Sequence, residues 1–405
     1  MIDVEEAKRL ILEASSRLDV VEVDLDEALA RVLAEDVTAD RDFPPTDRSA
    51  MDGFAVRWED VREPGRTLAL AGEARAGRPL EGLRVEPGSC VRIMTGSTVP
   101  PGADTVVMVE LTTEDTNAGT VSFQGEPLRG QHIRVRGEDL RAGERALSGG
   151  APIHAPEIAA LASVGRTRVR VYRAPVVHVV SSGDEVVEPD VTPAPHQVRN
   201  SNARCLLAQL RELRLEGRYL GIAPDTRQGL DEAVRAGLRG DVLLITGGVS
   251  MGKYDLVGEV LAEAGMRQVF HKVAVRPGKP MLVGRRGDCL VVGLPGNPVS
   301  TFTGFAVFVA PALRKMMGYA RCDNLEVTAV LAERLKRKPG RTTYHLARVA
   351  QTTAGFTALP VRAMGSGDVV SMSRANAFVV TPPGAHALDP GTRVTAILWP
   401  HFNLR

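Results

Sequence analysis

The residues best suited to chemistry lie in loops that contain glycine and follow apolar segments. The loops span residues 181–185, 221–225, 246–255 and 293–298. Three of them carry an acid: Glu185, Asp225 and Asp255. Glycines let a backbone approach a phosphate or a flat ring, and exposed N–H groups in such loops favour anions. Acids there would repel an anion unless a divalent cation bridges them, so the loops predict a phosphate ligand and a Mg²⁺ held by these three carboxylates.

Each of these features also has a purely structural explanation. Asp225 and Asp255 each precede a predicted helix and can serve as its N-cap. Glycine-rich turns between strands and helices occur throughout α/β proteins, and none of these loops matches a P-loop or a G-x-G-x-x-G motif. The prediction of a ligand site therefore depends on the loops meeting at one edge of a sheet.

A second cluster is basic and lies within residues 272–280. If this segment is a strand, alternation puts Lys272 and Arg276 on one face, and the following Pro-Gly turn brings Lys279 back toward them. Three such cations predict a pocket for an oxyanion. The alternative is a solvated edge strand whose charges prevent aggregation. A third polar segment, residues 47–56, would by itself be called a turn.

The elements that must position these loops alternate along residues 175–318. Strands are predicted at 176–180, 219–222, 241–245, 268–275, 281–283 and 289–293, and helices at 202–215, 226–238, 255–264 and 298–317. This alternation predicts an open, mainly parallel α/β sheet. In such a sheet, ligands bind beyond the carboxyl ends of the strands, where the loops described above would lie.

The rest of the chain has a different texture. Asp3 is expected to cap a first helix with an apolar stripe, and a second helix is expected at about 26–34. Residues 42–147 hold short apolar runs separated by Gly and Pro turns, which predicts a compact β domain. A helix is expected at 156–163, and the chain after Gly318 is expected to be a small β domain.

Composition bounds the function without identifying it. A chain of 405 residues predicts about two to three domains. Lys and Arg number 50 against 49 Asp and Glu, so no global positive field exists for nucleic acid or an anionic membrane, and an anion must be held by a local cluster. The four cysteines and eight histidines show no metal-ligand spacing, which argues against zinc. Neither a signal peptide nor a membrane-length apolar run is found, so we expect a cytoplasmic protein.

Eight segments together resemble a known family. They read DRSAMDGFAV, RIMTGSTVPPGADTVVMVE, RGEDLRAGE, SSGDEV, NSNARCLLAQL, TGGVSMGKYD, VRPGKPMLVG and GLPGNPVSTF. This is their order in the MoeA family of molybdopterin molybdenumtransferases, which includes the C-terminal domain of gephyrin. The sequence resembles that family closely as far as residue 318 and more loosely beyond it.

The resemblance implies a homodimer of four-domain subunits. Its domains would be a helical linking domain (1–41 with 142–174), a β domain (42–141), an α/β molybdopterin-binding domain (175–320) and a C-terminal β domain (321–405). The substrates would be adenylylated molybdopterin and molybdate, and Mg²⁺-dependent cleavage of the pyrophosphate link would release AMP. No protein nucleophile is required. The subunit would have no nucleic-acid or membrane partner. Transient contacts with the adenylyltransferase and with molybdoenzyme chaperones would fit this role.

The resemblance also assigns roles to individual residues. Asp52 and Asp139 match motif acids that act across the dimer interface, and Glu185, Asp225 and Asp255 match the acids of the pterin-nucleotide and metal loops. The implied cofactor contacts are Ser182, Gly183, Gly247, Gly248, Ser250, Lys272, Pro295, Asn297 and Pro298. The implied molybdate contacts are Arg276, Lys279, Pro280, Arg348 and Ser371, with Ser366 competing for the place of Ser371.

Two other functions compete with this one. The first is a scaffold module that binds a pterin without catalysis, because gephyrin shows that the fold can anchor a partner. The second is a relative that inserts tungsten, since molybdate and tungstate are nearly isosteric.

Overall fold

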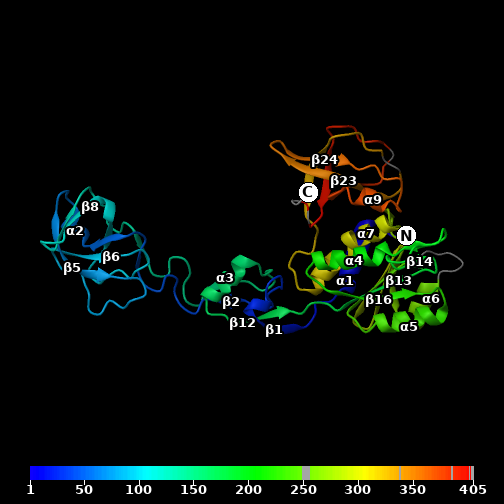
Figure 1. Ribbon diagram of the computed structural model, residues 1–405, viewed down its shortest axis with the longest axis horizontal. Coiled ribbons are helices and arrows are strands. Elements are labelled where there is room, and N and C mark those ends of the chain that lie inside the picture. Colours follow the sequence, from blue (N-terminus) through cyan, green and yellow to red (C-terminus); the bar gives the residue numbers. More distant parts are fainter. Residues whose placement is uncertain (249–255, 337–338, 385, 401, 403–405) are drawn as a thin grey trace. The chain divides into compact units, whose positions relative to one another are not determined.

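The computed structural model describes residues 1–248, 256–336, 339–384, 386–400 and 402. The chain forms two compact units (Figure 1). The larger unit comprises Met1–Ala34, Gly150–His154 and Val169–Arg405, and the smaller unit comprises Glu35–Gly149 and Ala155–Arg168. The predicted division into four domains remains a proposal.

A six-stranded sheet forms the centre of the larger unit, in the order β16-β13-β17-β21-β20-β18. The strands are β13 (Val177–Ser182), β16 (Gly217–Ala223), β17 (Val242–Thr246), β18 (Arg267–His271), β20 (Leu282–Arg286) and β21 (Cys289–Leu294). The first four strands in the sheet order are mutually parallel, and β20 runs antiparallel to both β21 and β18. The predicted open, mainly parallel sheet is confirmed.

Helices cover both faces of this sheet (Figure 1). They are α1 (Val4–Ala14), α4 (Ser201–Glu212), α5 (Arg227–Gly237), α6 (Leu256–Glu263), α7 (Pro298–Gly304) and α8 (Ala310–Met316), the last two joined by a π-helical turn at Phe305–Val309. Successive residues of β17 point to opposite faces, as the pleat requires. Leu244 packs with the residues of α1, α4, α7 and α8, whereas Ile245 packs with those of α5 and α6. The predicted cap on the first helix is also confirmed, because the Asp3 carboxylate accepts a hydrogen bond from the backbone of Glu6.

Two predicted elements of this unit are wrong. The expected helix at 26–34 is only a 3₁₀ turn, Leu25–Glu27, after which Ala30 adopts a φ of 62°. The backbone N–H groups of Ala30 and Leu33 donate to residues 153 and 151, so this stretch pairs with a distant segment and cannot form a helix.

The expected strand 268–275 is interrupted as well. It ends at His271, and Lys272 adopts a φ of 71°. The chain then pairs through β19 (Val275–Arg276) with the C-terminal sheet. Lys272 and Arg276 therefore do not share one face of a continuous strand.

The C-terminal part of the larger unit is a closed barrel. Its strands are β22 (Glu326–Leu331), β23 (Thr342–Thr352), β24 (Gly355–Pro360), β25 (Ala377–Thr381) and β26 (Arg393–Leu398), and α9 (Val369–Met372) lies between β24 and β25. The pairing β23-β24-β22-β26-β25 closes through a direct β23–β25 pair. Trp399 contacts Phe302 of α7 at a ring-centroid distance of 4.6 Å and Phe378 of the barrel at 5.2 Å. The barrel is thereby packed against the long helix of the sheet domain.

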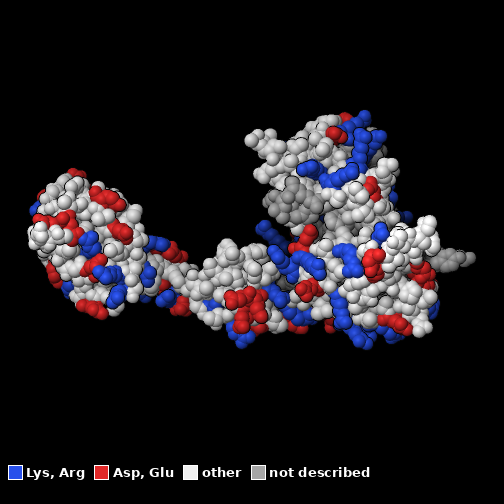
Figure 2. All heavy atoms as spheres, in the orientation of Figure 1, with Lys and Arg blue, Asp and Glu red and all other residues white. Residues whose placement is uncertain are grey.

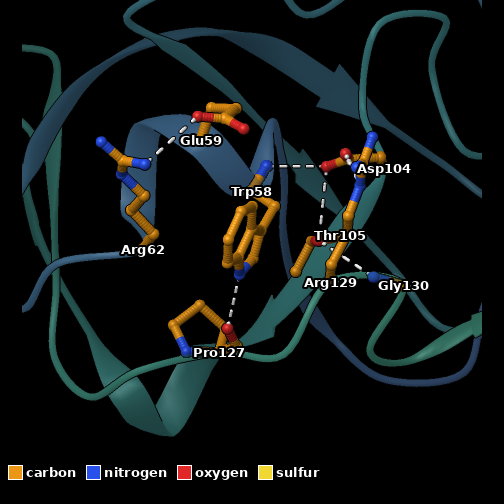
Figure 3. A network of polar contacts seen from close by, with 8 residues as sticks. All are labelled: Trp58, Glu59, Arg62, Asp104, Thr105, Pro127, Arg129 and Gly130. Carbon is orange, nitrogen blue, oxygen red and sulfur yellow. Dashed lines mark hydrogen bonds and ion pairs between the residues drawn. The ribbon is translucent and has the colours of Figure 1, made fainter.

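The smaller unit is the predicted compact β structure. Its sheet contains β4 (Gly53–Val56), β5 (Thr67–Ala74), β6 (Ser89–Ile93), β7 (Thr105–Met108), β8 (Thr112–Asp115) and β9 (Thr120–Phe123). Figure 3 shows how Asp104 organises one end of it, accepting hydrogen bonds from the Trp58 backbone at 2.7 Å and from Arg129 at 3.0 Å. The Trp58 indole donates to the carbonyl of Pro127 at 2.9 Å, so α2 (Trp58–Val61) is fixed to a distant loop.

Short elements complete the chain. They are β1 (Val20–Asp24), β2 (Val37–Thr38), β3 (Arg48–Ser49), β10 (Ile133–Arg134), β11 (Arg145–Leu147), α3 (Ala155–Ser163), β12 (Arg168–Tyr172), β14 (Val186–Val187) and β15 (Val198–Arg199), with a 3₁₀ turn at Val109–Leu111. Within the described residues, no helix is both long and apolar enough to cross a membrane. Positive and negative side chains are interspersed over the face shown in Figure 2, in keeping with the near-zero net charge.

A clamp at the amino-terminal edge of the sheet yields a stability prediction. Arg173 donates to both carboxylate oxygens of Asp241 at 2.6 and 2.7 Å, and these hydrogen bonds are the main cause of the lowered pKa of Asp241. We expect Asp241→Asn to cost about 1.5–3 kcal/mol of stability at neutral pH, the range for hydrogen bonds to a charged group. Because the pKa is depressed, this stabilisation is complete above the ordinary Asp pKa of about 4 and is lost as pH falls through the folded value.

Thermal unfolding of the wild type and Asp241→Asn at pH 7 and at about pH 3 tests this expectation. The difference in Tm should narrow in acid. Asp231→Asn is the matched control, because its partner Arg235 is exposed and the pair is worth only about 0.3–0.5 kcal/mol. Equal losses for the two variants would contradict the assignment.

Candidate active site

The strand order of the central sheet creates a crevice at one edge. After β13, the chain adds β16 on one side and then β17 on the other, so the loops that leave β13 and β17 diverge. Ligands of α/β sheets bind at such a switch point, outside the carboxyl ends of the strands. A cavity of about 700 Å³ lies there, and Ser182, Glu185 and Gly247 are among the residues that line it. We call it the larger cavity.

The glycines of these loops have a local structural reason. Gly247 has a φ of 91°, and a Cβ at this position would lie 2.3 Å from the carbonyl oxygen of Ser182. Gly183 has a φ of 135°, and its Cβ would lie 2.8 Å from the Glu185 carboxylate; at Gly248 the clash is with Val257 at 2.5 Å. The loops after β13 and β17 thus touch each other through backbone. Contact of these glycines with a ligand stays a prediction.

A polar network that was not predicted from the sequence fixes Asn200, which lines the larger cavity. Asn200 caps α4 through its Oδ1, which also accepts from Ser181, and its amide nitrogen donates to the Tyr219 hydroxyl at 2.8 Å. Tyr219 donates in turn to Glu188 at 2.6 Å, and Glu188 pairs with Arg204. Burial is the main cause of the raised pKa of Tyr219, so the phenol stays neutral and can donate. The Asn-Ser-Asn run at residues 200–202 could have indicated the capping role of Asn200, because Asn is a favoured N-cap.

The predicted metal ligands come together in part. The backbone N–H of Asp225 donates to Asp184 at 3.0 Å, which joins the loops after β13 and β16. Partial burial raises the pKa of Asp225, and the negative charges of Asp184 and Glu185 add to the effect. The prediction that Asp225 caps α5 is wrong, because Thr226 is the N-cap and accepts from the Gly229 backbone. The Asp225 carboxylate is therefore not used as a cap.

Asp255, the third predicted metal ligand, and Ser250, a predicted cofactor contact, lie outside the described residues. Within the described part of the chain, no group of three or more His, Cys, Asp or Glu side chains is arranged to hold a metal ion.

A second cavity of about 470 Å³ is basic, and we call it the basic cavity. Arg276, Lys279 and Arg341 line it, and none of the described residues that line it is acidic. The Nη1 atom of Arg276 is buried without a hydrogen-bond partner. Burial lowers the pKa of Arg341, and the positive charge of Arg276 lowers it further. Two guanidinium groups thus face a cavity whose described lining holds no acidic side chain, an arrangement that favours the binding of an anion.

The two cavities are adjacent. Pro280, Pro295 and Asn297 line both of them. The loop that carries the last two is held from α7, because the Thr301 hydroxyl donates to the carbonyl of Pro295 at 2.5 Å. The Val299 backbone donates to Ser366, which also lines the basic cavity, so the barrel closes it on that side. Pro298 lines only the larger cavity.

Other residues assigned by resemblance lie elsewhere. Arg348 is exposed on β23 opposite Leu359, and it does not line the basic cavity. The Ser371 hydroxyl is buried and donates to Asp368, at the start of α9. Lys272 is half-buried and lines neither cavity. The molybdate roles of Arg348 and Ser371 and the cofactor role of Lys272 stay predictions.

Arg341 is a cation of the basic cavity that was not predicted from the sequence. It follows the Pro339–Gly340 turn and immediately precedes β23, the strand that pairs with β19. Its side chain donates to the carbonyl of Val275 at 3.2 Å, which places it beside Arg276. Only the pairing of β19 with β23, a contact between distant segments, shows that these two arginines are neighbours.

The two acids from the first half of the chain belong to the smaller unit. Asp52 accepts hydrogen bonds from the backbone and hydroxyl of Thr95 at 2.6 and 2.7 Å, and these bonds lower its pKa. Asp139 is exposed and pairs with Arg134 at 2.5 Å. Both residues are exposed on that unit.

Comparisons with known proteins cover nearly the whole chain. Three family models match: the MoeA N-terminal region, domains I and II, at residues 2–165; a probable molybdopterin binding domain at 178–315; and the MoeA C-terminal region, domain IV, at 328–399. Proteins named molybdopterin molybdenumtransferase from Bacillus subtilis and Staphylococcus epidermidis are 34% and 33% identical. The match covers 98% of this chain in both cases, and 94% and 95% of those proteins.

Solved structures agree with this match. Two crystal structures of the molybdopterin biosynthesis MoeA protein from Pyrococcus horikoshii superpose with TM-scores of 0.84 and 0.82 at 27% and 29% identity. Each alignment covers 98% of this chain, and 100% and 99% of those chains.

Proposed function

The chain belongs to the MoeA family, the molybdopterin molybdenumtransferases of molybdenum cofactor biosynthesis, and from this premise we propose that it transfers molybdate to adenylylated molybdopterin and releases AMP. The observation that carries the proposal is the pair of adjacent cavities. One is large enough for a pterin nucleotide, and the other offers cations without any acid. A dianion in the basic cavity would lie next to a dithiolene in the larger one.

The basic cavity fits molybdate in charge and in donor type. Molybdate is a tetrahedral dianion that accepts hydrogen bonds and donates none. Arg276 offers an unpaired N–H, and Arg341 and Lys279 add positive charge. Because no acidic side chain is among the described lining residues, the local charge of the site is positive. It can therefore attract a dianion although the net charge of the protein is close to zero.

Mg²⁺ remains part of this proposal. Glu185 and Asp225 would hold it, together with Asp255 and the phosphate oxygens of the substrate. The raised pKa of Asp225 supports this role, because a cation would relieve the repulsion from Asp184 and Glu185. When bound, Mg²⁺ stabilises the charge that develops on the leaving phosphate. The protein's own contribution is to hold the pyrophosphate beside these acids and to leave the Asp225 carboxylate uncapped.

The family relationship supports three further proposals about the working enzyme. It acts as a homodimer in which Asp52 and Asp139 of one subunit complete the cleft of the other. It receives its substrate from an adenylyltransferase and delivers its product to molybdoenzyme chaperones. It works in the cytoplasm, and the four free cysteines, Cys90, Cys205, Cys289 and Cys322, are in keeping with a reducing compartment.

Release of AMP is the direct test. Purified protein, adenylylated molybdopterin and Mg²⁺ should yield AMP only when molybdate is added. Equal AMP release with and without molybdate would contradict a molybdenumtransferase. Replacing molybdate with an equimolar mixture of molybdate and tungstate, followed by metal analysis of the product, decides between the two oxyanions.

Substituting Asp225 should separate activity from stability. We expect Asp225→Asn to reduce AMP release by about 100-fold or more, the loss typical of a misplaced catalytic group. In the absence of metal, its free energy of unfolding should stay within about 1 kcal/mol of the wild-type value, because the repulsion from Asp184 and Glu185 is removed together with the hydrogen bond from the Asp184 backbone, and the group is largely exposed.

Thermal unfolding with and without Mg²⁺ checks this expectation. Mg²⁺ should stabilise the wild type more than the variant. Asp190→Asn, an exposed acid in the neighbouring loop, is the control and should change neither quantity. A variant that is both inactive and strongly destabilised would instead assign Asp225 a structural role.

A further inference from the structure

Two polar atoms in the wall of the larger cavity are buried and have no hydrogen-bond partner among the described residues. They are Asn202 Oδ1 and Ser182 Oγ. The Asn202 amide is oriented by its nitrogen, which donates to the carbonyl oxygen of Gly296 at 2.7 Å. Because the nitrogen is engaged, Oδ1 is the amide atom left for a ligand. Ser182 is only 3% exposed, so its hydroxyl is shielded from bulk solvent.

These two atoms belong to one continuous surface. A Cβ built on Gly296 would lie 3.7 Å from the Cα of Gly247, and a Cβ built on Gly247 would lie 3.1 Å from Ser182 Oγ. The surface therefore runs from Asn202 through Gly296 and Gly247 to Ser182, and we call it the Asn202–Ser182 wall. Its middle consists of two glycines, so no side chain projects from it there. A flat ring can lie against such a surface.

The unpaired acceptor in the Asn202–Ser182 wall determines which kind of ligand can bind there. An unpaired buried acceptor costs about 1–3 kcal/mol, so a ligand that binds tightly there must bring a donor to Asn202 Oδ1. Phosphate and molybdate oxygens are acceptors and cannot supply one. The substrate carries suitable N–H groups in two places, on the pterin ring and on the adenine ring. The Asn202–Ser182 wall could therefore recognise the N–H edge of either ring.

The position of the wall favours the pterin over the adenine. Gly296 lies between Pro295 and Asn297, which line both cavities, so the wall borders the basic cavity. The dithiolene that accepts molybdate is attached directly to the reduced pterin system, whereas the adenine is separated from it by a pyrophosphate and a ribose. We propose that Asn202 and Ser182 recognise the N–H edge of the pterin and thereby orient the dithiolene toward the basic cavity. This inference rests on the proposed function.

Binding measurements with two probes test the proposal. The probes are 6-carboxypterin and AMP, titrated by calorimetry against the full-length protein and its Ser182→Ala and Asn202→Ala variants. Each variant should bind 6-carboxypterin about 5- to 150-fold more weakly, the loss expected for one hydrogen bond to a buried acceptor, and should bind AMP as the wild type does. The Tm of unliganded Ser182→Ala should not fall, because an unpaired buried hydroxyl is replaced by an apolar group.

Ser181→Ala is the matched control. Its hydroxyl is also buried but is hydrogen-bonded to Asn200 at 3.1 Å, so this variant should lose Tm and keep its affinity for 6-carboxypterin. Weaker binding of AMP with unchanged binding of 6-carboxypterin would assign the wall to adenine and overturn the proposal. Unchanged binding of both probes would overturn it as well. Molybdate-dependent AMP release by the wild type is measured in parallel, because its absence would contradict the proposed function whatever the variants bind.

Discussion

An alanine at position 247 should abolish activity and destabilise the larger unit. Gly247 has a φ of 91°, and a Cβ there would lie 2.3 Å from the Ser182 carbonyl oxygen, which is backbone and cannot rotate away. Backbone strain of about 1–3 kcal/mol adds to overpacking of about 1–3 kcal/mol. Because the clash forces apart the two loops that form the switch-point crevice, AMP release should fall by more than about 100-fold.

Two other glycines separate the causes of this effect. Gly221 has a φ of 100° but open space around its Cβ position, so Gly221→Ala tests strain without a clash. Gly296 has ordinary contacts, the nearest at 3.7 Å, so Gly296→Ala tests a methyl group in the cavity wall. We expect Tm and AMP release to be lowest for Gly247→Ala. Should Gly221→Ala prove equally damaging, the contact with Ser182 would not be the cause.

The central sheet was predictable because its signals are local. β17 appears in the sequence as a nearly continuous apolar run, β13 is rich in valine, and the glycine loops follow both strands directly. Pairing of parallel strands then brings those loops to one edge without further information. The larger cavity, and the gathering of Glu185 and Asp225 near it, could therefore be inferred from sequence.

The errors occur where long-range pairing decides the backbone. The segment 26–34 has a helical pattern, but residues 151 and 153 take its hydrogen bonds. At Asp225, the neighbouring Thr226 supplies the cap, and propensity alone does not choose between two adjacent cap residues. No short-range pattern shows which partner a polar backbone group will find.

The basic cavity illustrates the same limit. Periodicity placed Lys272 beside Arg276, but the chain turns at Lys272 and Arg276 joins a different sheet. Its true neighbour is Arg341, which is 65 residues away in the sequence. The resemblance assigned Arg348 of β23 instead. Arg348 and Arg341, which lies in the turn before β23, are therefore alternative contacts for molybdate, and an experiment can distinguish them.

Arg276→Ala should raise the KM for molybdate about 10- to 150-fold, the equivalent of a lost hydrogen bond to a charged group. At saturating molybdate kcat should change little, because the interaction holds the substrate before and during the reaction. The variant should not lose Tm, because Nη1 of Arg276 has no partner and its charge repels Arg341. Arg276→Lys should recover only part of the affinity, since an ammonium lacks the planar fork of the guanidinium.

Arg341→Ala and Arg348→Ala decide which tail arginine completes the anion site. Arg341 lines the basic cavity, and burial together with the charge of Arg276 lowers its pKa. A dianion bound there would offset the unfavourable free energy of holding these two positive charges close together. Arg348 is exposed, so Arg348→Ala should leave the KM for molybdate unchanged. Molybdate at about 100 times its Kd should stabilise the wild type by about 2.7 kcal/mol, and this gain should be lost in a variant lacking both Arg276 and Arg341. The reverse result, in which Arg348→Ala raises KM and Arg341→Ala does not, would restore the assignment made by resemblance. Molybdate would then bind outside the basic cavity, because Arg348 is exposed on β23 and does not line that cavity.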